Sequence, residues 1–228
     1  MAAMVHGAQI VAIIVTLFLT SFSGCTLAAD EDPLQDFCVA DLTSQINVNG
    51  FVCKDPSAVK ADDFTFTGFR NAANVTNTTN GFVPTPAFVQ QLPGLNTLGL
   101  SILRSDFAPD GLNGPHVHPR ASELFLVVQG KIEVGFVTSN NTLFSQTLEQ
   151  GDVFIIPRGL VHFQHNIGGT AAVAFAVFNS QNSGVERLQN TLFGSGIPDA
   201  VLQKTFQLDV AIIDQLKKAF STSTPSNY

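Results

Sequence analysis

The stretch from Gly111 to Gly130, GLNGPHVHPRASELFLVVQG, is the part of the chain that decides the fold. Successive side chains of a β-strand point to opposite faces, so His116 and His118 direct their imidazoles to the same face. Glu123 opens the next apolar run and can add a carboxylate at the same point. The stretch therefore predicts strands that carry candidate metal ligands.

A fourth candidate ligand lies in a second motif, GDVFIIPRGLVHFQHN, between Gly151 and Asn166. His162 completes a set of three imidazole nitrogens and one carboxylate oxygen. On a six-coordinate ion this set leaves one or two exchangeable positions, which favours chemistry or small-molecule binding over a closed structural site. His165 is expected on the opposite face of the strand. Each histidine taken singly could be an ordinary hydrogen-bonded residue, but their joint pattern favours a metal site.

Short strands are predicted on both sides of these motifs. The segments are 63–69, 98–107, 123–128, 131–137, 143–148, 153–156, 161–166 and 171–179. Gln129-Gly130 predicts a tight hairpin, and Pro109-Asp110-Gly111 and Asn113-Gly114-Pro115 predict turns. Many short strands with closely spaced turns predict an all-β antiparallel sandwich or barrel rather than βαβ units.

The C-terminal end has a helical pattern. Asp209 can cap a helix in which apolar side chains recur at helical spacing, at Val210, Ile213, Leu216 and Phe220. A shorter helix is predicted over 198–205, and residues 221–228 are predicted to fray. The apolar stripe is expected to pack against a neighbour, within the subunit or across an interface.

The N-terminal end predicts a targeting segment. Residues 1–28 contain no Asp, Glu, Lys or Arg, and residues 10–20 are nearly all apolar. This run is too short to span a bilayer comfortably, so a signal peptide cleaved near Ala28 is favoured over a membrane anchor. The usual positive charge is missing, and only His6 stands in its place.

Two cysteines remain after signal removal, Cys38 and Cys53. In an oxidising compartment they most simply form one disulfide, with two free thiols as the alternative. Three Asn-x-Ser/Thr sequons, at Asn74, Asn77 and Asn140, are candidate glycosylation sites. The first two lie in a predicted exposed loop over 71–81, and Asn140 lies at a predicted hairpin tip.

The charge of the chain excludes some classes of partner. The formal net charge is −7 with no polybasic run, so neither a nucleic acid nor an anionic membrane surface is expected as a partner. The chain also contains 20 Phe and is 45% hydrophobic. This content indicates either buried subunit interfaces or a Phe-rich core.

The two motifs resemble the first and second motifs of the cupin superfamily. Four further stretches, DFCVADL (36–42), LNTLG (95–99), DFAP (106–109) and FNSQN (178–182), are similar to the plant germin and germin-like proteins. The resemblance covers essentially the whole mature chain. It implies a single cupin jelly-roll β-barrel over 63–195. It further implies a signal peptide (1–28), a disulfide-bonded N-terminal extension (29–62) and a C-terminal helical segment and tail (196–228).

The resemblance also implies a cofactor, an assembly and a location. Manganese, with iron as the alternative, would be held by His116, His118, Glu123 and His162. The family implies a homohexamer built as a trimer of dimers and secretion to the apoplast, the plant cell wall space. One small departure is Asp110-Gly111, where the family more often has Gly-Gly; Asp also tolerates turn conformations.

The reaction is where this chain departs from the germins proper, which oxidise oxalate with O₂. In them two asparagines hold the oxalate; Asn113 corresponds to one, but Leu103 replaces the other. Since a site that loses a hydrogen-bonding group loses much of its affinity, superoxide dismutation at the metal is the favoured activity. Oxalate oxidation is the first alternative. The second is a non-enzymatic wall or receptor-like protein that binds a small ligand of the auxin type.

Overall fold

The structure is a computed structural model that describes residues 34–46 and 50–221. The predicted signal peptide and the predicted frayed tail beyond Ser221 lie outside the described residues. Within those ranges, no helix combines the length and the apolar character that crossing a bilayer requires.

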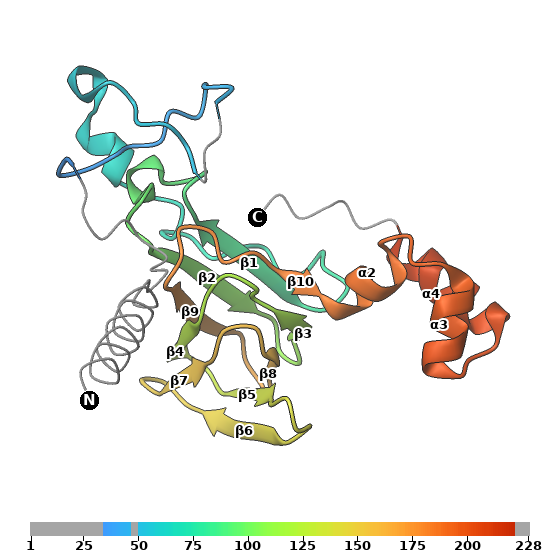
Figure 1. The fold of residues 1–228 in the computed structure, drawn as a ribbon. Helices are drawn as coiled ribbons and strands as arrows, with labels where there is room; N and C mark the ends of the chain where they lie inside the picture. Colours follow the sequence, from blue (N-terminus) through green and yellow to red (C-terminus); the bar gives the residue numbers. More distant parts are fainter. Residues whose placement is uncertain (1–33, 47–49, 222–228) are drawn as a thin grey trace, which may run out of the picture. The chain divides into compact units, whose positions relative to one another are not determined.

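The described residues form ten strands in two antiparallel sheets of five (Figure 1). The strand order is β1-β2-β9-β4-β7 in the first sheet and β10-β3-β8-β5-β6 in the second. The bounds are β1 Phe82–Ala87, β2 Ser101–Phe107, β3 Leu112–Val117, β4 Glu123–Gln129, β5 Ile132–Val137, β6 Leu143–Leu148, β7 Val153–Ile156, β8 Val161–Asn166, β9 Ala172–Phe178 and β10 Glu186–Arg187. This is a mostly-β fold of two antiparallel sheets, as the sequence predicts.

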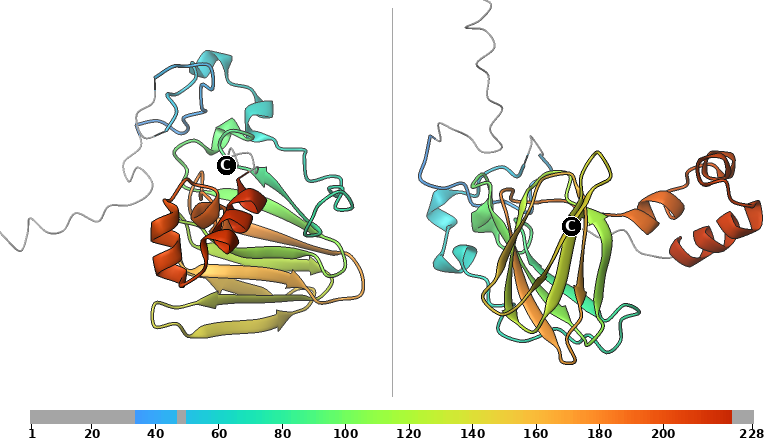
Figure 2. Two further views of the ribbon diagram at one scale, coloured as in Figure 1. Left: turned by 90° about the vertical axis from the view of Figure 1, so that its right-hand side faces the viewer. Right: turned by 90° about the horizontal axis from the view of Figure 1, so that it is seen from below.

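The two sheets face each other around an apolar core (Figure 2). Strand alternation decides which side chains enter it: in β8, His162, Gln164 and Asn166 are buried, and the residues between them are more exposed. The core combines Phe82, Phe88, Phe107, Phe125 and Phe178 with smaller apolar residues such as Val127, Ile132, Val134, Ala174 and Ala176. Part of the high Phe content of the chain is therefore explained by this core.

The N-terminal extension is closed by an internal disulfide and is joined by hydrogen bonds to the segment that contains Pro93 and Asn96. Cys38 and Cys53 form the predicted disulfide. The Ala40 amide donates to the Pro93 carbonyl at 2.9 Å, and the Asn96 side-chain amide donates to the Phe51 carbonyl at 2.8 Å. Three short 3-10 helices lie in this region: η1 Pro56–Ala58, η2 Ala61–Phe64 and η3 Pro93–Leu95.

Helices follow the last strand: α2 Leu188–Phe193, α3 Asp199–Phe206 and α4 Val210–Phe220. The last two confirm the prediction, and the Asp209 side chain accepts a hydrogen bond from the Ala211 amide as its cap. Ile213 is fully buried, and both α2 and α3 contact α4. The helix α2 and the short strands β1 and β10 were not predicted.

The predicted strand over 63–69 is wrong. Residues 61–64 form the 3-10 helix η2, because the Asp63 carboxylate accepts a hydrogen bond from the Lys60 amide at 2.8 Å and closes a tight turn. The chain then turns, and Phe69 contacts Phe66 and Phe175 edge to face. Phe69 therefore packs on β9 without forming a strand, whereas Phe64 contacts Phe37 in the N-terminal extension.

Two of the turn predictions are also wrong. Strands β4 and β5 belong to different sheets, so Gln129-Gly130 is a tight connection between sheets and not a hairpin. Gly130 has φ of 90°, and a Cβ there would lie 2.5 Å from the Ala172 Cβ. Asn113-Gly114-Pro115 lies inside β3, where the register with β8 shifts between Asn113 and His116.

Two other turn predictions are confirmed. Asp110 adopts φ of 59° in the turn before β3, which is the left-handed region that Asp tolerates. Asn140 lies at the tip of the hairpin between β5 and β6, where the Thr138 amide donates to the Thr142 carbonyl.

Candidate metal centre

Pairing between strands brings the four predicted side chains together. His116 in β3 lies opposite His162 in β8, and directly opposed residues of antiparallel strands share a face. His118 is the first residue after the end of β3. Glu123 opens β4 in the other sheet, paired with Phe178 and Ile156. The set therefore joins the two sheets across the interior of the barrel.

The four side chains converge closely and are all buried. One ligand atom from each can be chosen so that all lie within 4.8 Å of one another. Glu123 Oε2 lies 3.2 Å from Nε2 of both His118 and His162. The ring centroids of His116 and His162 are 4.0 Å apart.

The backbone fixes the tautomer of each histidine. Nδ1 of His116, His118 and His162 faces the carbonyl oxygen of Gly114, Gly184 and Leu160, respectively. A carbonyl only accepts, so each Nδ1 carries the proton and donates it. Each Nε2 then offers a lone pair inward, which is the state that a metal requires.

Two buried atoms of the set have no hydrogen-bond partner within the described part of the chain: Glu123 Oε2 and His162 Nε2. Both carry lone pairs, and they face each other at 3.2 Å. Buried polar atoms in native proteins are normally satisfied. A divalent cation between them supplies what both lack, so the residues fit a metal ion of the kind that nitrogen and oxygen ligands hold.

Burial and neighbouring rings shape the charge of the site. Burial lowers the pKa of His116 well below its usual value, and the adjacent His162 and His118 lower it further. Burial raises the pKa of the Glu123 carboxyl, but a proton on the facing nitrogen of His118 or His162, 3.2 Å away, would donate to the carboxylate, outweigh burial and hold that pKa below its usual range. The result is neutral His116 beside ionised Glu123.

Gln164 connects the metal set to Asn113, which the sequence singled out. The Asn113 amide donates to Gln164 Oε1 at 2.8 Å, and Gln164 Nε2 lies 3.4 Å from Glu123 Oε1. Gln164 is almost fully buried and was missed from the sequence. The signal was present, because Gln164 lies two residues after His162 on the same face of β8.

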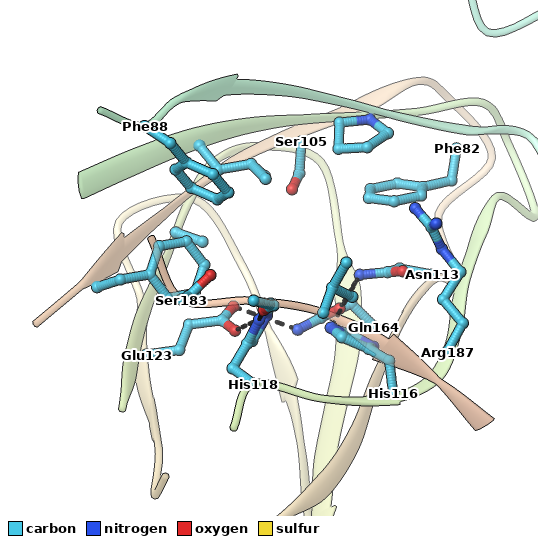
Figure 3. A pocket seen from close by; sticks show the side chains of 16 residues that line it. Phe82, Phe88, Ser105, Asn113, His116, His118, Glu123, Gln164, Ser183 and Arg187 are labelled. Carbon is cyan, nitrogen blue, oxygen red and sulfur yellow. Dashed lines mark hydrogen bonds and ion pairs between the residues drawn. The ribbon is translucent and has the colours of Figure 1, made fainter. Parts of the chain in front are cut away.

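A pocket with a cavity volume of about 40 Å³ is lined by three of the four side chains, His116, His118 and Glu123 (Figure 3). Leu103, which replaces an oxalate-binding asparagine of the germins, lies in the wall of the pocket. Asn113 lines the pocket near His116. Other lining residues were not predicted; they include Phe82, Phe88, Ser105, Ser183, Val185 and Arg187. The site therefore has a polar, metal-binding floor and a largely apolar wall.

Comparisons with known proteins agree with the geometry. The family described as Cupin matches residues 67–214. Germin-like protein 5-1 of Oryza sativa subsp. japonica is 50% identical over 208 residues, which is 90% of this chain and 93% of that protein. Germin-like protein subfamily T member 2 of Arabidopsis thaliana is 52% identical over 198 residues, or 86% of this chain and 89% of that protein.

Among solved structures, an oxalate oxidase in complex with the substrate analogue glycolate is 44% identical, with a TM-score of 0.81. The match covers 86% of this chain and all of that one. The fold and the converging side chains thus define a cupin with a His₃Glu metal-binding site. Within that superfamily, the chain belongs to the germin-like proteins.

Proposed function

We propose that this germin-like protein is a secreted manganese enzyme that converts superoxide and protons to O₂ and hydrogen peroxide. The observation that carries the proposal is a buried His₃Glu set with lone pairs directed at one point, beside a pocket that admits a small anion. When bound, a manganese ion supplies one-electron oxidation and reduction by alternating between Mn(II) and Mn(III). Iron is the alternative metal, since these ligands accept both.

The residues of the chain then have separate roles. His116, His118, Glu123 and His162 hold the ion as neutral imidazoles and one carboxylate. Asn113 lines the pocket, and its amide nitrogen donates to Gln164 Oε1 and lies 3.4 Å from His116 Nε2. Binding of the ion by His116 would free the second amide hydrogen for an anion or a water. Gln164 keeps Asn113 and Glu123 in place.

Leu103 supports superoxide over oxalate as the substrate. Its side chain lies in the pocket wall among Phe82 and Phe88, where it offers no hydrogen bond to a second carboxylate. Superoxide requires no such contact. Oxalate oxidation remains the second candidate because Asn113 is retained and because the matched oxalate oxidase has the same fold.

The test compares the two activities in one sample of the secreted protein. Superoxide dismutation per bound manganese and hydrogen peroxide release from oxalate are measured in the wild type and in Leu103→Asn. We expect dismutation in both proteins and no oxalate turnover in the wild type. Oxalate oxidation by the wild type without dismutation would overturn the proposal.

We also propose the homohexamer that germin-like family membership suggests. The outer face of the β1-β2-β9-β4-β7 sheet carries a hollow whose apolar residues are exposed: Leu100 52%, Leu124 39%, Ile155 56% and Val177 37%. A contiguous exposed apolar patch favours contact with another protein surface. A second copy of the chain is the partner that the family suggests.

We further propose that the protein is secreted to the apoplast. A disulfide suits an oxidising compartment, and the Cys38–Cys53 bond is present. The three sequon asparagines, Asn74, Asn77 and Asn140, are all exposed and accessible to glycosylation. We retain the proposed division into a signal peptide (1–28), an N-terminal extension (29–62), a barrel (63–195) and a helical segment with tail (196–228).

A further inference from the structure

Within the described residues, each sheet ends in two strands that have a neighbouring strand on one side only. These edge strands are β1 and β7 in the first sheet and β10 and β6 in the second (Figure 1). The outer side of an edge strand presents unpaired backbone N–H and C=O groups, to which a strand of another molecule can add. Natural proteins block such edges with prolines, charges, bulges or very short strands.

Three of the four edge strands have such protection. Strand β1 contains Pro84 and Pro86, and its register with β2 runs through both positions without a shift. The missing N–H groups of these prolines therefore belong to the outer side of β1, where a proline is tolerated. Strand β10 has only two residues, Glu186 and Arg187, and both are charged. Strand β7 has four residues and is followed directly by Pro157.

Strand β6 has none of these features. Its six residues, Leu143–Leu148 (LFSQTL), include no proline, glycine or charged residue, and they pair with β5 without a bulge. All of them except Leu148 are exposed, and the exposed fraction is 52% for Leu143 and 53% for Phe144. An uncharged six-residue strand without proline or glycine has the sequence signature of a segment that stacks with copies of itself. The outer side of β6 is therefore the edge that most favours pairing with another chain.

The two ends of β6 differ in their flanking residues. At the C-terminal end, Glu149 follows the strand and pairs with Lys131 at 3.2 Å, so charged residues flank that end. At the N-terminal end, the hairpin tip over 138–142 contains no charged residue. It contains instead the sequon that begins at Asn140. A glycan is bulky and solubilising, so a glycan on Asn140 would protect the end that has no charge.

The hairpin tip presents Asn140 in a form that can carry a glycan. Asn140 is exposed, and its Oδ1 accepts a hydrogen bond from the Thr138 hydroxyl. Its Nδ2, the atom to which an N-linked glycan is attached, has no hydrogen-bond partner among the described residues. The Asn141 amide donates to the Thr138 carbonyl at 2.9 Å and closes the turn. The turn therefore holds the sequon directly ahead of Leu143, the first residue of β6.

We propose that an N-linked glycan on Asn140 covers the open edge of β6 and prevents this strand from pairing with a strand of another molecule. The group that occupies the edge is the branched, hydrophilic oligosaccharide itself. It excludes a second strand by its volume and its hydration and needs no hydrogen bond to the backbone of β6. The proposal rests on the glycosylation of Asn140 proposed above, and it is independent of the reaction at the metal set.

The first test uses the secreted wild-type protein. We expect mass spectrometry of its glycopeptides to find Asn140 glycosylated. We also expect those β6 amides that are not bonded to β5 to exchange their hydrogens quickly, because no other strand pairs with them. An unmodified Asn140, or β6 amides that another chain protects on the outer side, would overturn the proposal.

The second test removes the glycan in three ways: enzymatic deglycosylation of the folded wild type, Asn140→Gln and Thr142→Ala. Thr142→Ser keeps a valid sequon and is the matched control, and Asn74→Gln controls for the loss of a glycan elsewhere. We expect the weight-average mass of each protein that lacks the Asn140 glycan to rise at least about twofold, because edge pairing joins two or more copies. Light scattering coupled to size-exclusion chromatography measures the mass, which both controls should keep. An unchanged mass after deglycosylation would contradict the proposal.

A charge placed in the strand then assigns the contact to β6. Ser145 lies within β6, opposite Gly135 of β5. Added to Asn140→Gln, the substitution Ser145→Lys should restore the wild-type mass, because a lysine on an edge strand blocks pairing. Metal content and thermal unfolding establish that each variant is folded. A folded double variant that still associates would show that pairing does not use β6, and it would overturn the proposal.

Discussion

His162 and His165 are three residues apart in β8 but have different environments. His162 points inward, is 1% exposed and belongs to the metal set. His165 is partly exposed, with its Nε2 2.7 Å from Asp110 Oδ1 at the surface. The pair offers a matched comparison of a buried ligand with an ordinary surface histidine of the same strand.

We expect His162→Ala to lose most of its bound metal and His165→Ala to keep the wild-type content. Removing His162 leaves three ligands and an unsatisfied Glu123 oxygen, whereas removing His165 breaks only a surface contact. Metal per chain is measured by mass spectrometry of the purified, acid-digested proteins. Wild-type metal content in both variants would show that the ion does not bind at His162.

Gln164→Leu is expected to weaken metal binding by about tenfold without abolishing it. Gln164 orients Glu123 and Asn113 and does not itself belong to the four converging residues. Loss of a residue that orients a metal ligand commonly reduces metal affinity about 10- to 100-fold, and we expect the lower limit of this range here. Competition with a chelator measures the change, and Gln146→Leu on the exposed strand β6 is the control.

The site is expected to keep its metal in mildly acidic solution. Burial and neighbouring rings lower the pKa of His116, so protons compete with the metal at His116 only below the usual histidine value of about 6.5. The pKa of His116 is lower in the folded state than in the unfolded state. As the pH falls, the unfolded state of the metal-free protein therefore binds the proton at a higher pH than the folded state does. Stability should then fall as the pH decreases through about 6.5.

Metal content after dialysis at a series of pH values measures the first effect. The thermal unfolding of metal-free protein over the same series measures the second. Release of half of the metal at or above pH ~6.5, the value for an unperturbed histidine, would contradict the predicted protection.

Residues whose position follows from local alternation could be predicted from the sequence. His116, His118, Glu123 and His162 lie in short motifs, and the structure brings their side chains together as the motifs indicate. Arg187 could not be placed in this way, because its position depends on the pairing of β10 with β3, a contact between distant parts of the chain.

At the scale of elements, the loop of the N-terminal extension is closed by one disulfide. Cys38 and Cys53 are separated by 15 residues and close a loop outside the barrel. By the loop-entropy relation a disulfide of this size contributes about 3 kcal/mol. Around it, hydrogen bonds join the described part of the extension to Pro93 and Asn96.

Cys38→Ser together with Cys53→Ser is expected to reduce the free energy of unfolding by about 3 kcal/mol while leaving the metal set intact. Denaturant unfolding of the wild type and the double variant gives the difference, and metal content provides the control. Wild type under reducing conditions should match the variant. An unchanged free energy of unfolding would mean that the loop is held by its noncovalent contacts alone.

Most barrel strands could be predicted, but their partners could not. Period-two alternation indicates where β8 and β9 lie and which faces are buried. The same pattern failed at 63–69, where Asp63 closes a 3-10 turn. It also failed at Gln129-Gly130, because a short connection can join strands of two sheets as readily as strands of one hairpin.

At the scale of the whole molecule, the apolar outer face of the first sheet predicts self-association. Ile155→Glu places a charge in the exposed hollow formed with Leu124 and Val177, and it should shift the protein to a smaller assembly. Ile155→Val keeps the surface apolar and should keep the wild-type mass. Light scattering coupled to size-exclusion chromatography measures both. A wild-type protein that is monomeric would contradict the hexamer outright.

The measurement that tests the central claim most directly is superoxide dismutation by the secreted protein, with bound manganese quantified in the same sample. The account predicts activity proportional to manganese content, and loss of both in His118→Ala. The His165→Ala protein should retain both. A manganese-filled wild-type protein without dismutase activity would contradict the proposed reaction and leave the site as one that binds small molecules.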